Sequence, residues 1–162
     1  MGHMEIRYLR EAELAEFLTL LKAKAQFDGC PAALAATEAT LQQAMFAAQP
    51  QTYALVAAGA DGLRGMATFS PTYSTFLARP GLWLDDLYVA SAHRGQGIGR
   101  ALMRALCTIA MERGCARIDW IVARNNDDAK TFYEEMGAQL SERVQLGRLV
   151  QAGIAQLGAV RR

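Results

Sequence analysis

The sequence predicts a single α/β domain, residues 4–162, built on a mixed β-sheet with helices on both faces. Three observations predict it. Of the 162 residues, 52% are hydrophobic, which is enough to bury one core without disulfides or metal. Strand-like and helix-like segments follow in the order β-α-α-β-β-β-α-β-α-β, which lacks the regular alternation of a doubly wound nucleotide fold. An apolar strand also runs directly into a glycine-rich loop that opens a helix.

The first part of the chain is predicted to form one strand and two helices. Residues 5–10 have the character of a short strand. Apolar residues then recur at helical spacing: Leu14, Phe17, Leu18 and Leu21. A turn at 28–31 ends this helix, and residues 33–48, rich in Ala, Gln and Thr, have helical composition closed by Pro50. The opening Met1-Gly2-His3 is interpreted as a cloning remnant outside the fold.

The middle of the chain is predicted to form three strands. Residues 52–58 and 63–70 are apolar runs separated by the turn 59–62, a pattern typical of a β-hairpin. A strand at 82–89 follows after a loop. That loop carries three cyclic side chains: Tyr73, Phe76 and Pro80.

The last part of the chain is predicted to hold two helices and further strands. A helix begins at Gly97 and is stopped by Gly114. Its apolar residues repeat at helical spacing: Ile98, Leu102, Ala105, Leu106 and Ile109. Residues 117–122 are predicted as a strand and 127–136 as a short helix, and the remainder is expected to supply one or two closing strands.

Composition excludes several classes of function. The net charge is +1, and the arginines are scattered without interleaved aromatic residues, so no nucleic-acid partner is expected. No apolar run reaches the roughly 18 residues of a membrane span, and no charged leader precedes an apolar segment, so we expect a cytoplasmic protein without a membrane partner. The three cysteines lack the spacing of metal or redox sites, so no metal is expected.

The glycine-rich loop has the features of an anion-binding site. Gly95, Gly97 and Gly99 free consecutive backbone N–H groups at a helix N-terminus, where phosphate oxygens bind favourably. Arg94 and Arg100 bracket the loop with positive charge. A purely structural strand-to-helix turn is the alternative interpretation of these glycines.

Two common nucleotide loops fit this segment poorly. A P-loop ends in Gly-Lys-Ser/Thr, whereas this chain continues Gly99-Arg100-Ala101. A dinucleotide-binding loop requires glycine or alanine at position 100, and Asp119 falls at the start of its strand rather than at the end.

Leu87-Tyr88-Val89 followed by Arg94-x-x-Gly97-x-Gly99 resembles motif A of the GCN5-related N-acetyltransferase (GNAT) family. Asn126, seven residues before Tyr133, resembles a second motif of that family, and the similar region spans residues 83–138. The resemblance implies the acyl-CoA N-acyltransferase fold, with a mostly antiparallel sheet and a splayed pair of parallel strands. It also implies acetyl-CoA as cofactor and CoA as product, without metal. The cofactor-binding residues implied are Leu87, Tyr88, Val89, Arg94, Gly95, Gln96, Gly97, Ile98, Gly99, Arg100, Asn126 and Tyr133.

Amine acetylation needs a base and an acid. An alkylamine with a pKa of about 10.4 must lose a proton near neutral pH. Asp85 is the candidate base, acting through water, and alternation places Trp83 and Leu87 on its face of the strand, with Leu84, Asp86 and Tyr88 on the other. Tyr133 matches the family's acid, which protonates the departing thiolate. The alternatives are a solvated or structural Asp85 and a Tyr133 that only anchors its helix.

Within the family, the chain resembles the diamine and polyamine acetyltransferases. Carboxylates and aromatic walls suit an alkylammonium chain. The expected acceptor-binding residues are Phe27, Asp28, Tyr73, Phe76 and Asp85. Ser74 stands where relatives of that group tend to carry a carboxylate, so a shorter monoamine or diamine, or a lysine-like amino acid, fits equally well. Asp28 is alternatively part of the turn that ends its helix.

The expected function is therefore acetyl transfer from acetyl-CoA to a primary amine of a small molecule by direct attack. A peptide or protein N-acetyltransferase and a non-catalytic acyl-CoA sensor are the alternatives. Members of the family are often dimeric, so the resemblance also implies a homodimer as one assembly.

Overall fold

The computed structural model describes residues 4–159, and the chain divides into two compact units, one ending at Ile121 and the other beginning at Val122. The interpretation of residues 1–3 as a cloning remnant concerns residues outside the described range. The single domain over residues 4–162 stays a prediction. In the described range, no helix is both long enough and apolar enough to cross a membrane.

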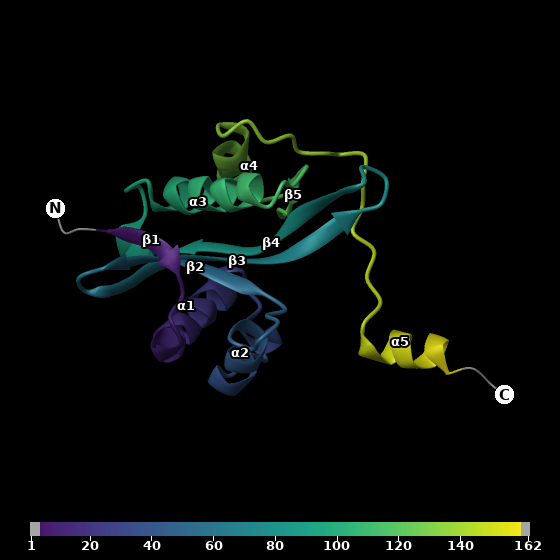
Figure 1. Cartoon of the computed structure of the whole chain (residues 1–162), viewed down its shortest axis with the longest axis horizontal. Coiled ribbons are helices and arrows are strands. Elements are labelled where there is room, and N and C mark those ends of the chain that lie inside the picture. Colours follow the sequence, from purple (N-terminus) through teal and green to yellow (C-terminus); the bar gives the residue numbers. More distant parts are fainter. Residues whose placement is uncertain (1–3, 160–162) are drawn as a thin grey trace. The chain divides into compact units, whose positions relative to one another are not determined.

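The first unit is built on a sheet with the strand order β1-β2-β3-β4-β5 (Figure 1). Neighbours from β1 to β4 pair antiparallel, whereas β4 and β5 pair parallel. The predicted mixed, mostly antiparallel sheet is therefore confirmed. The strands described are β1 (Glu5–Tyr8), β2 (Tyr53–Gly59), β3 (Gly62–Ser74), β4 (Arg79–Val89) and β5 (Ile118–Asp119).

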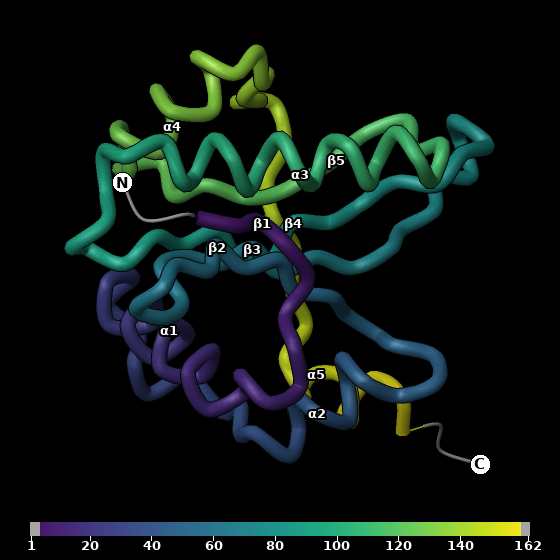
Figure 2. Tube along the Cα trace, turned by 60° about the vertical axis from the view of Figure 1, so that its left-hand side comes forward, coloured from purple at the N-terminus to yellow at the C-terminus, as the bar shows by residue number. Residues whose placement is uncertain are grey.

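Helices cover both faces of this sheet, as predicted (Figures 1 and 2). Helices α1 (Leu14–Phe27) and α2 (Glu38–Met45) lie on one face, and α3 (Ile98–Glu112) lies on the other. Three 3-10 turns precede α1, α2 and α3 in the chain: Glu11–Glu13, Pro31–Ala33 and Ser91–His93.

The core fixes both helix layers against β3. Phe17 of α1 and Met66 of β3 are completely buried in one cluster. On the opposite face, a Cβ at Gly65 would lie 2.9 Å from the Tyr88 carbonyl oxygen and 3.2 Å from Ile98 Cγ2. A larger residue at position 65 would push away the first turn of α3, so this glycine holds the start of α3 close to β3 and β4.

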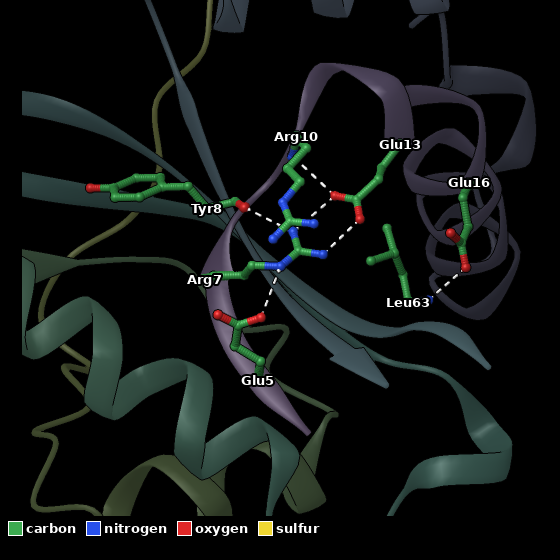
Figure 3. Close-up of polar contacts among 7 residues, drawn as sticks. All are labelled: Glu5, Arg7, Tyr8, Arg10, Glu13, Glu16 and Leu63. Atoms are coloured by element: carbon green, nitrogen blue, oxygen red, sulfur yellow. Dashed lines mark hydrogen bonds and ion pairs between the residues drawn. The ribbon is translucent and has the colours of Figure 1, made fainter. Parts of the chain in front are cut away.

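A polar cluster at the beginning of α1 ties the helix to the sheet (Figure 3). Arg7 of β1 donates from its two terminal nitrogens to the two carboxylate oxygens of Glu13, at 2.9 and 2.7 Å. Glu16 accepts a hydrogen bond from the backbone N–H of Leu63 at 2.5 Å. The hydrogen bond from Arg7 lowers the pKa of Glu13. Bidentate pairing of this kind fixes orientation as well as distance.

The second helix is shorter than the predicted 33–48. The Thr37 hydroxyl accepts a hydrogen bond from the Thr40 backbone N–H at 3.2 Å, which caps the helix immediately before Glu38. Composition alone did not distinguish the alanines before Thr37 from those within the helix.

The predicted loop with Tyr73 and Pro80 is largely a β-hairpin. β3 runs to Ser74 and β4 begins at Arg79, so Tyr73 pairs with Pro80. Proline lacks a backbone N–H and therefore favours the end of a strand in a sequence-based prediction. It is tolerated near the start of a strand, at a position where no backbone N–H has to donate to the neighbouring strand. Here the Pro80 carbonyl accepts a hydrogen bond from the Ala116 N–H at 2.8 Å.

The predictions for the end of the chain are partly wrong. β5 covers only Ile118–Asp119 rather than 117–122. The second unit contains α4 (Asp127–Glu134), as predicted, but the described residues after it form α5 (Gln151–Gly158) and no closing strand. Alanine, glutamine and leucine are frequent in α5 and favour helix, a preference that the prediction of strands overlooked.

Candidate active site

A β-bulge interrupts β4 at Asp85. Leu84 pairs with Phe69 and Asp86 pairs with the preceding residue Thr68, so Asp85 is an extra residue without a partner position on β3. Such a bulge reverses the faces of the residues beyond it. Leu84 and Asp86 therefore face opposite sides of the sheet, and the predicted strict alternation across this segment is wrong.

The bulge presents the Asp85 carboxylate away from the buried core. Asp85 is exposed, while its strand neighbours Leu84 and Tyr88 are buried. Although the residue is exposed, neighbouring atoms remove part of the solvent around its carboxylate, which raises the pKa of Asp85, and the negative charge of Asp86 raises it further. A hydrogen bond from Trp83 and the charge of Lys24 act in the opposite direction without cancelling the rise. A carboxylate of raised pKa is a better proton acceptor than an ordinary one.

Beside Asp85 lies an ion network that the sequence did not predict. Lys24 of α1 forms ion pairs with Asp28, one helical turn later, and with Asp86 at 3.3 Å. The other oxygen of Asp86 accepts a hydrogen bond from the Thr68 hydroxyl at 2.7 Å. Asp28, predicted to bind the acceptor, is therefore already paired with an ammonium group. The i,i+4 spacing of Lys24 and Asp28 was a usable signal for this pair.

The edge of β4 is open beyond the short β5 strand. β5 pairs only with Leu82 and Trp83. From Leu84 to Val89, β4 has no partner strand on that side among the described residues. This is the separation of two parallel strands that the resemblance implied. It leaves the backbone groups of Leu87 and the N–H of Val89 available for an extended ligand, whereas the Val89 carbonyl accepts a hydrogen bond from Arg94.

The glycine-rich loop has the conformation expected of an anion cradle. Gly95 and Gly97 have φ values of 74° and 77°, in the region that favours glycine. A Cβ on either residue would meet no atom within 4 Å, so the loop is open on that side. Gly97 is the N-cap of α3, whose first backbone N–H groups have no partner within the helix. The loop therefore fits a pyrophosphate group.

Arg94 connects this loop to the end of α1. Its Nε donates a hydrogen bond to the Val89 carbonyl at 3.1 Å. Its guanidinium carbon lies 4.5 Å from the centre of the Phe27 ring and 5.5 Å from that of Tyr88. Phe27, predicted as an acceptor wall, thus supports a predicted cofactor-binding residue.

The other predicted aromatic walls lie elsewhere. Tyr73 and Phe76 are exposed at the β3–β4 hairpin, and Phe76 is fully exposed. Tyr73 pairs with Pro80, eight residues before Tyr88, which corresponds to about 26 Å along a strand. The structure therefore does not bring Phe27 together with Tyr73 and Phe76.

The second unit carries the remaining predicted residues. The side-chain oxygen of Asn126 accepts a hydrogen bond from the Ala129 backbone N–H at 3.1 Å and so caps α4. Tyr133 is buried on α4, and its ring lies 5.2 Å from that of Phe132 in an edge-to-face contact. Both residues thus contribute to the local structure of α4.

A family model identifies the chain. The model of the acetyltransferase (GNAT) family matches residues 12–138. The chain belongs to this family. The resemblance stated from the sequence is therefore confirmed, and the chain is placed among the N-acetyltransferases, which use acetyl-CoA.

Individual relatives are similar over different lengths. L-ornithine N5-acetyltransferase of Arabidopsis thaliana is 38% identical over 52% of this chain and 37% of its own length. Thialysine N-epsilon-acetyltransferase of Bos taurus is 28% identical over 86% of each chain. Among solved structures, an integron cassette protein from the mobile metagenome of V. cholerae is 27% identical and superposes with a TM-score of 0.79 over 99% of each chain.

Proposed function

We propose that this GNAT protein transfers the acetyl group of acetyl-CoA to a primary amine of a small molecule, a diamine, polyamine or lysine-like amino acid, by direct attack of the amine. The observation that carries this proposal is the bulge at Asp85, which sets a carboxylate of raised pKa on the strand that leads to the glycine-rich loop. Relatives named for ornithine and thialysine, both amino acids with a side-chain amine, support the acceptor class.

Two backbone features would hold the cofactor, which supplies the acetyl group as an activated thioester. The open edge of β4 from Leu87 to Val89 would pair with the pantetheine arm. The loop from Arg94 to Arg100 would hold the pyrophosphate through backbone N–H groups and the positive end of α3. Asn126 would help to fix the arm.

Asp85 would accept the proton that the acceptor amine must lose. Removing a proton from an amine with a pKa of about 10.4 at pH 7 costs roughly 4–5 kcal/mol without assistance. The raised pKa of Asp85 narrows the gap between base and amine. The short side chain favours transfer through one water molecule.

Tyr133 would return a proton to the departing thiolate. A thiol has a pKa of about 8.5 and a phenol about 10, so a neutral tyrosine is available as donor at pH 7. On this proposal, Tyr133→Phe lowers turnover more than it weakens acetyl-CoA binding. Equal losses in both would refute the acid role.

Release of CoA thiol from acetyl-CoA tests the reaction. The purified protein is offered spermidine, putrescine, L-lysine, an aminoglycoside and a short peptide in parallel, with calorimetric binding of acetyl-CoA measured alongside. Release that depends on a small amine supports the proposal. Release only with the peptide favours a protein acetyltransferase, and binding without any release favours an acyl-CoA sensor.

A matched pair of glycine variants tests the cofactor loop. Gly97→Asp should abolish acetyl-CoA binding, because it adds a negative charge where the pyrophosphate would sit. Gly114→Asp is the control, since Gly114 has a similar φ of 66° and equally open surroundings but lies after α3. If both variants lose binding alike, backbone strain rather than the loop explains the result.

A further inference from the structure

Lys24 lies between two carboxylates, Asp28 and Asp86, at the end of α1. Its ammonium group contacts Asp28 and lies 3.3 Å from Asp86 Oδ1. The exposed fractions are 20% for the Lys24 side chain, 38% for Asp28 and 23% for Asp86, so the group opens to solvent on the Asp28 side. Lys24 stays protonated: burial lowers its pKa, but Asp28 and Asp86 outweigh burial and raise it overall.

This arrangement changes what the two carboxylates can do. Bare carboxylates of Asp28 and Asp86 would carry two negative charges and attract the far ammonium of a diamine. With Lys24 between them the three groups carry a single net negative charge, and the contact position is filled. A diamine would have to displace an ammonium that is tethered to α1, and such displacement gains little.

Asp85 differs from Asp28 and Asp86 in its pairing with cations. It has no ion-pair partner among the described residues, although it lies next to Asp86 in the chain. The reacting end of an acceptor therefore meets a carboxylate that has no cation paired with it, whereas the other end meets two carboxylates that already share the ammonium of Lys24. Such a site suits a molecule with one cationic amine and a far end of zero net charge.

We propose that Lys24 determines acceptor specificity, because its ammonium fills the cation position between Asp28 and Asp86 and so favours lysine-like amino acids over diamines and polyamines. This inference rests on the proposed function. The α-ammonium and α-carboxylate of a free amino acid cancel each other, so its far end carries no net charge. In a diamine the far end carries a full positive charge.

L-lysine and cadaverine provide the matched test, because they share one amine-bearing chain and differ only in the carboxylate. For the wild-type protein, kcat/KM for L-lysine should exceed that for cadaverine by about fivefold or more, a modest electrostatic preference. In Lys24→Met, the ratio of the two values should fall at least about tenfold, because two uncompensated carboxylates then attract the far ammonium and repel the carboxylate.

Two further variants separate charge from structure. Lys24→Arg keeps the positive charge and should keep the preference for L-lysine. Lys22→Met removes an exposed lysine from the same helix and should leave the ratio unchanged. Acetyl-CoA binding and thermal unfolding of each variant show that it is folded.

The outcomes distinguish this inference from the proposed function. The role of Lys24 is overturned if the wild-type protein turns over cadaverine as well as or better than L-lysine. This comparison uses the wild-type protein alone, so it does not depend on the folding of any variant. An equal loss of kcat/KM for L-lysine and cadaverine in Lys24→Met also overturns the specificity role and assigns Lys24 a structural role. Absence of CoA release with every amine refutes the proposed function itself.

Discussion

Helix α1 carries an acid–base cluster at each end, and the two clusters are built differently. At its beginning, Arg7 donates to both oxygens of Glu13, and the pKa of Glu13 is lowered (Figure 3). At its end, the ammonium of Lys24 pairs with two carboxylates, while Asp85 has no ion pair with any residue between 4 and 159 and has a raised pKa.

The difference separates a stabilising cluster from a reactive one. A carboxylate whose charged form is matched by a guanidinium favours the folded chain but is a poor proton acceptor. A carboxylate that has lost solvent without gaining a cation costs stability, and its raised pKa prepares it for proton transfer. The same residue types thus support either role, and pairing decides which.

Replacing Asp85 and Glu13, one at a time, by the corresponding amide should give the largest difference between the two clusters. Asp85→Asn should lower kcat by about 100-fold or more, because it removes the proposed base. Its melting temperature should not fall, since the lost charge was unfavourable in the folded state. Glu13→Gln should show the reverse, with lower stability and nearly unchanged kcat. An active Asp85→Asn variant would assign the base to another group.

Removing the cation of the first cluster should cost stability. Arg7→Met loses both hydrogen bonds to a Glu13 side chain that is 21% exposed. We expect a loss of about 1–2 kcal/mol in the free energy of unfolding. Denaturant unfolding measures it, with Arg104→Met as the control, because Arg104 is exposed and has no ion pair in the described structure. Equal values for both variants would show that the Arg7 pair contributes nothing.

The two clusters should also respond to pH in opposite ways. The lowered pKa of Glu13 gives stability that is present above its unfolded pKa and is lost as the pH falls through its folded pKa. For Asp85 the folded pKa is the higher one, so its contribution is present below the unfolded value of 3.8 and is lost as the pH rises through the folded value.

The pH dependence of kcat/KM should show the same raised pKa of Asp85. Below it, Asp85 must first lose its own proton before it can accept one from the ammonium, so log kcat/KM rises with a slope of about one, and above it the profile levels off until the amine itself titrates. We expect this change of slope above pH 3.8, and at a higher pH in Lys24→Met, because the charge of Lys24 lowers the pKa of Asp85. Glu13→Gln should leave it in place. A profile without this change of slope would exclude Asp85 as the base.

The sequence predicted what depends on nearby residues. The glycine loop is local, because left-handed φ values at Gly95 and Gly97 and the start of α3 follow from consecutive residues. The bulge at Asp85 is not local, since register arises from pairing with Thr68 and Phe69 on another strand. The contact of Lys24 with Asp86 likewise joins a helix to a strand far along the chain. Periodicity within one segment therefore predicts neither the bulge nor the contact between Lys24 and Asp86.

The contact between Phe27 and Arg94 allows the smallest of these tests. It extends the cluster at the end of α1 to the glycine-rich loop, through a ring that is 59% exposed. Cation–π contacts at exposed sites contribute about 0.5–1 kcal/mol, so Phe27→Leu should raise KM for acetyl-CoA about threefold. KM for the amine should change less. Phe76→Leu, a change at a fully exposed ring, is the control. If Phe27→Leu raised KM for the amine instead, the ring would be an acceptor wall, as the sequence first indicated.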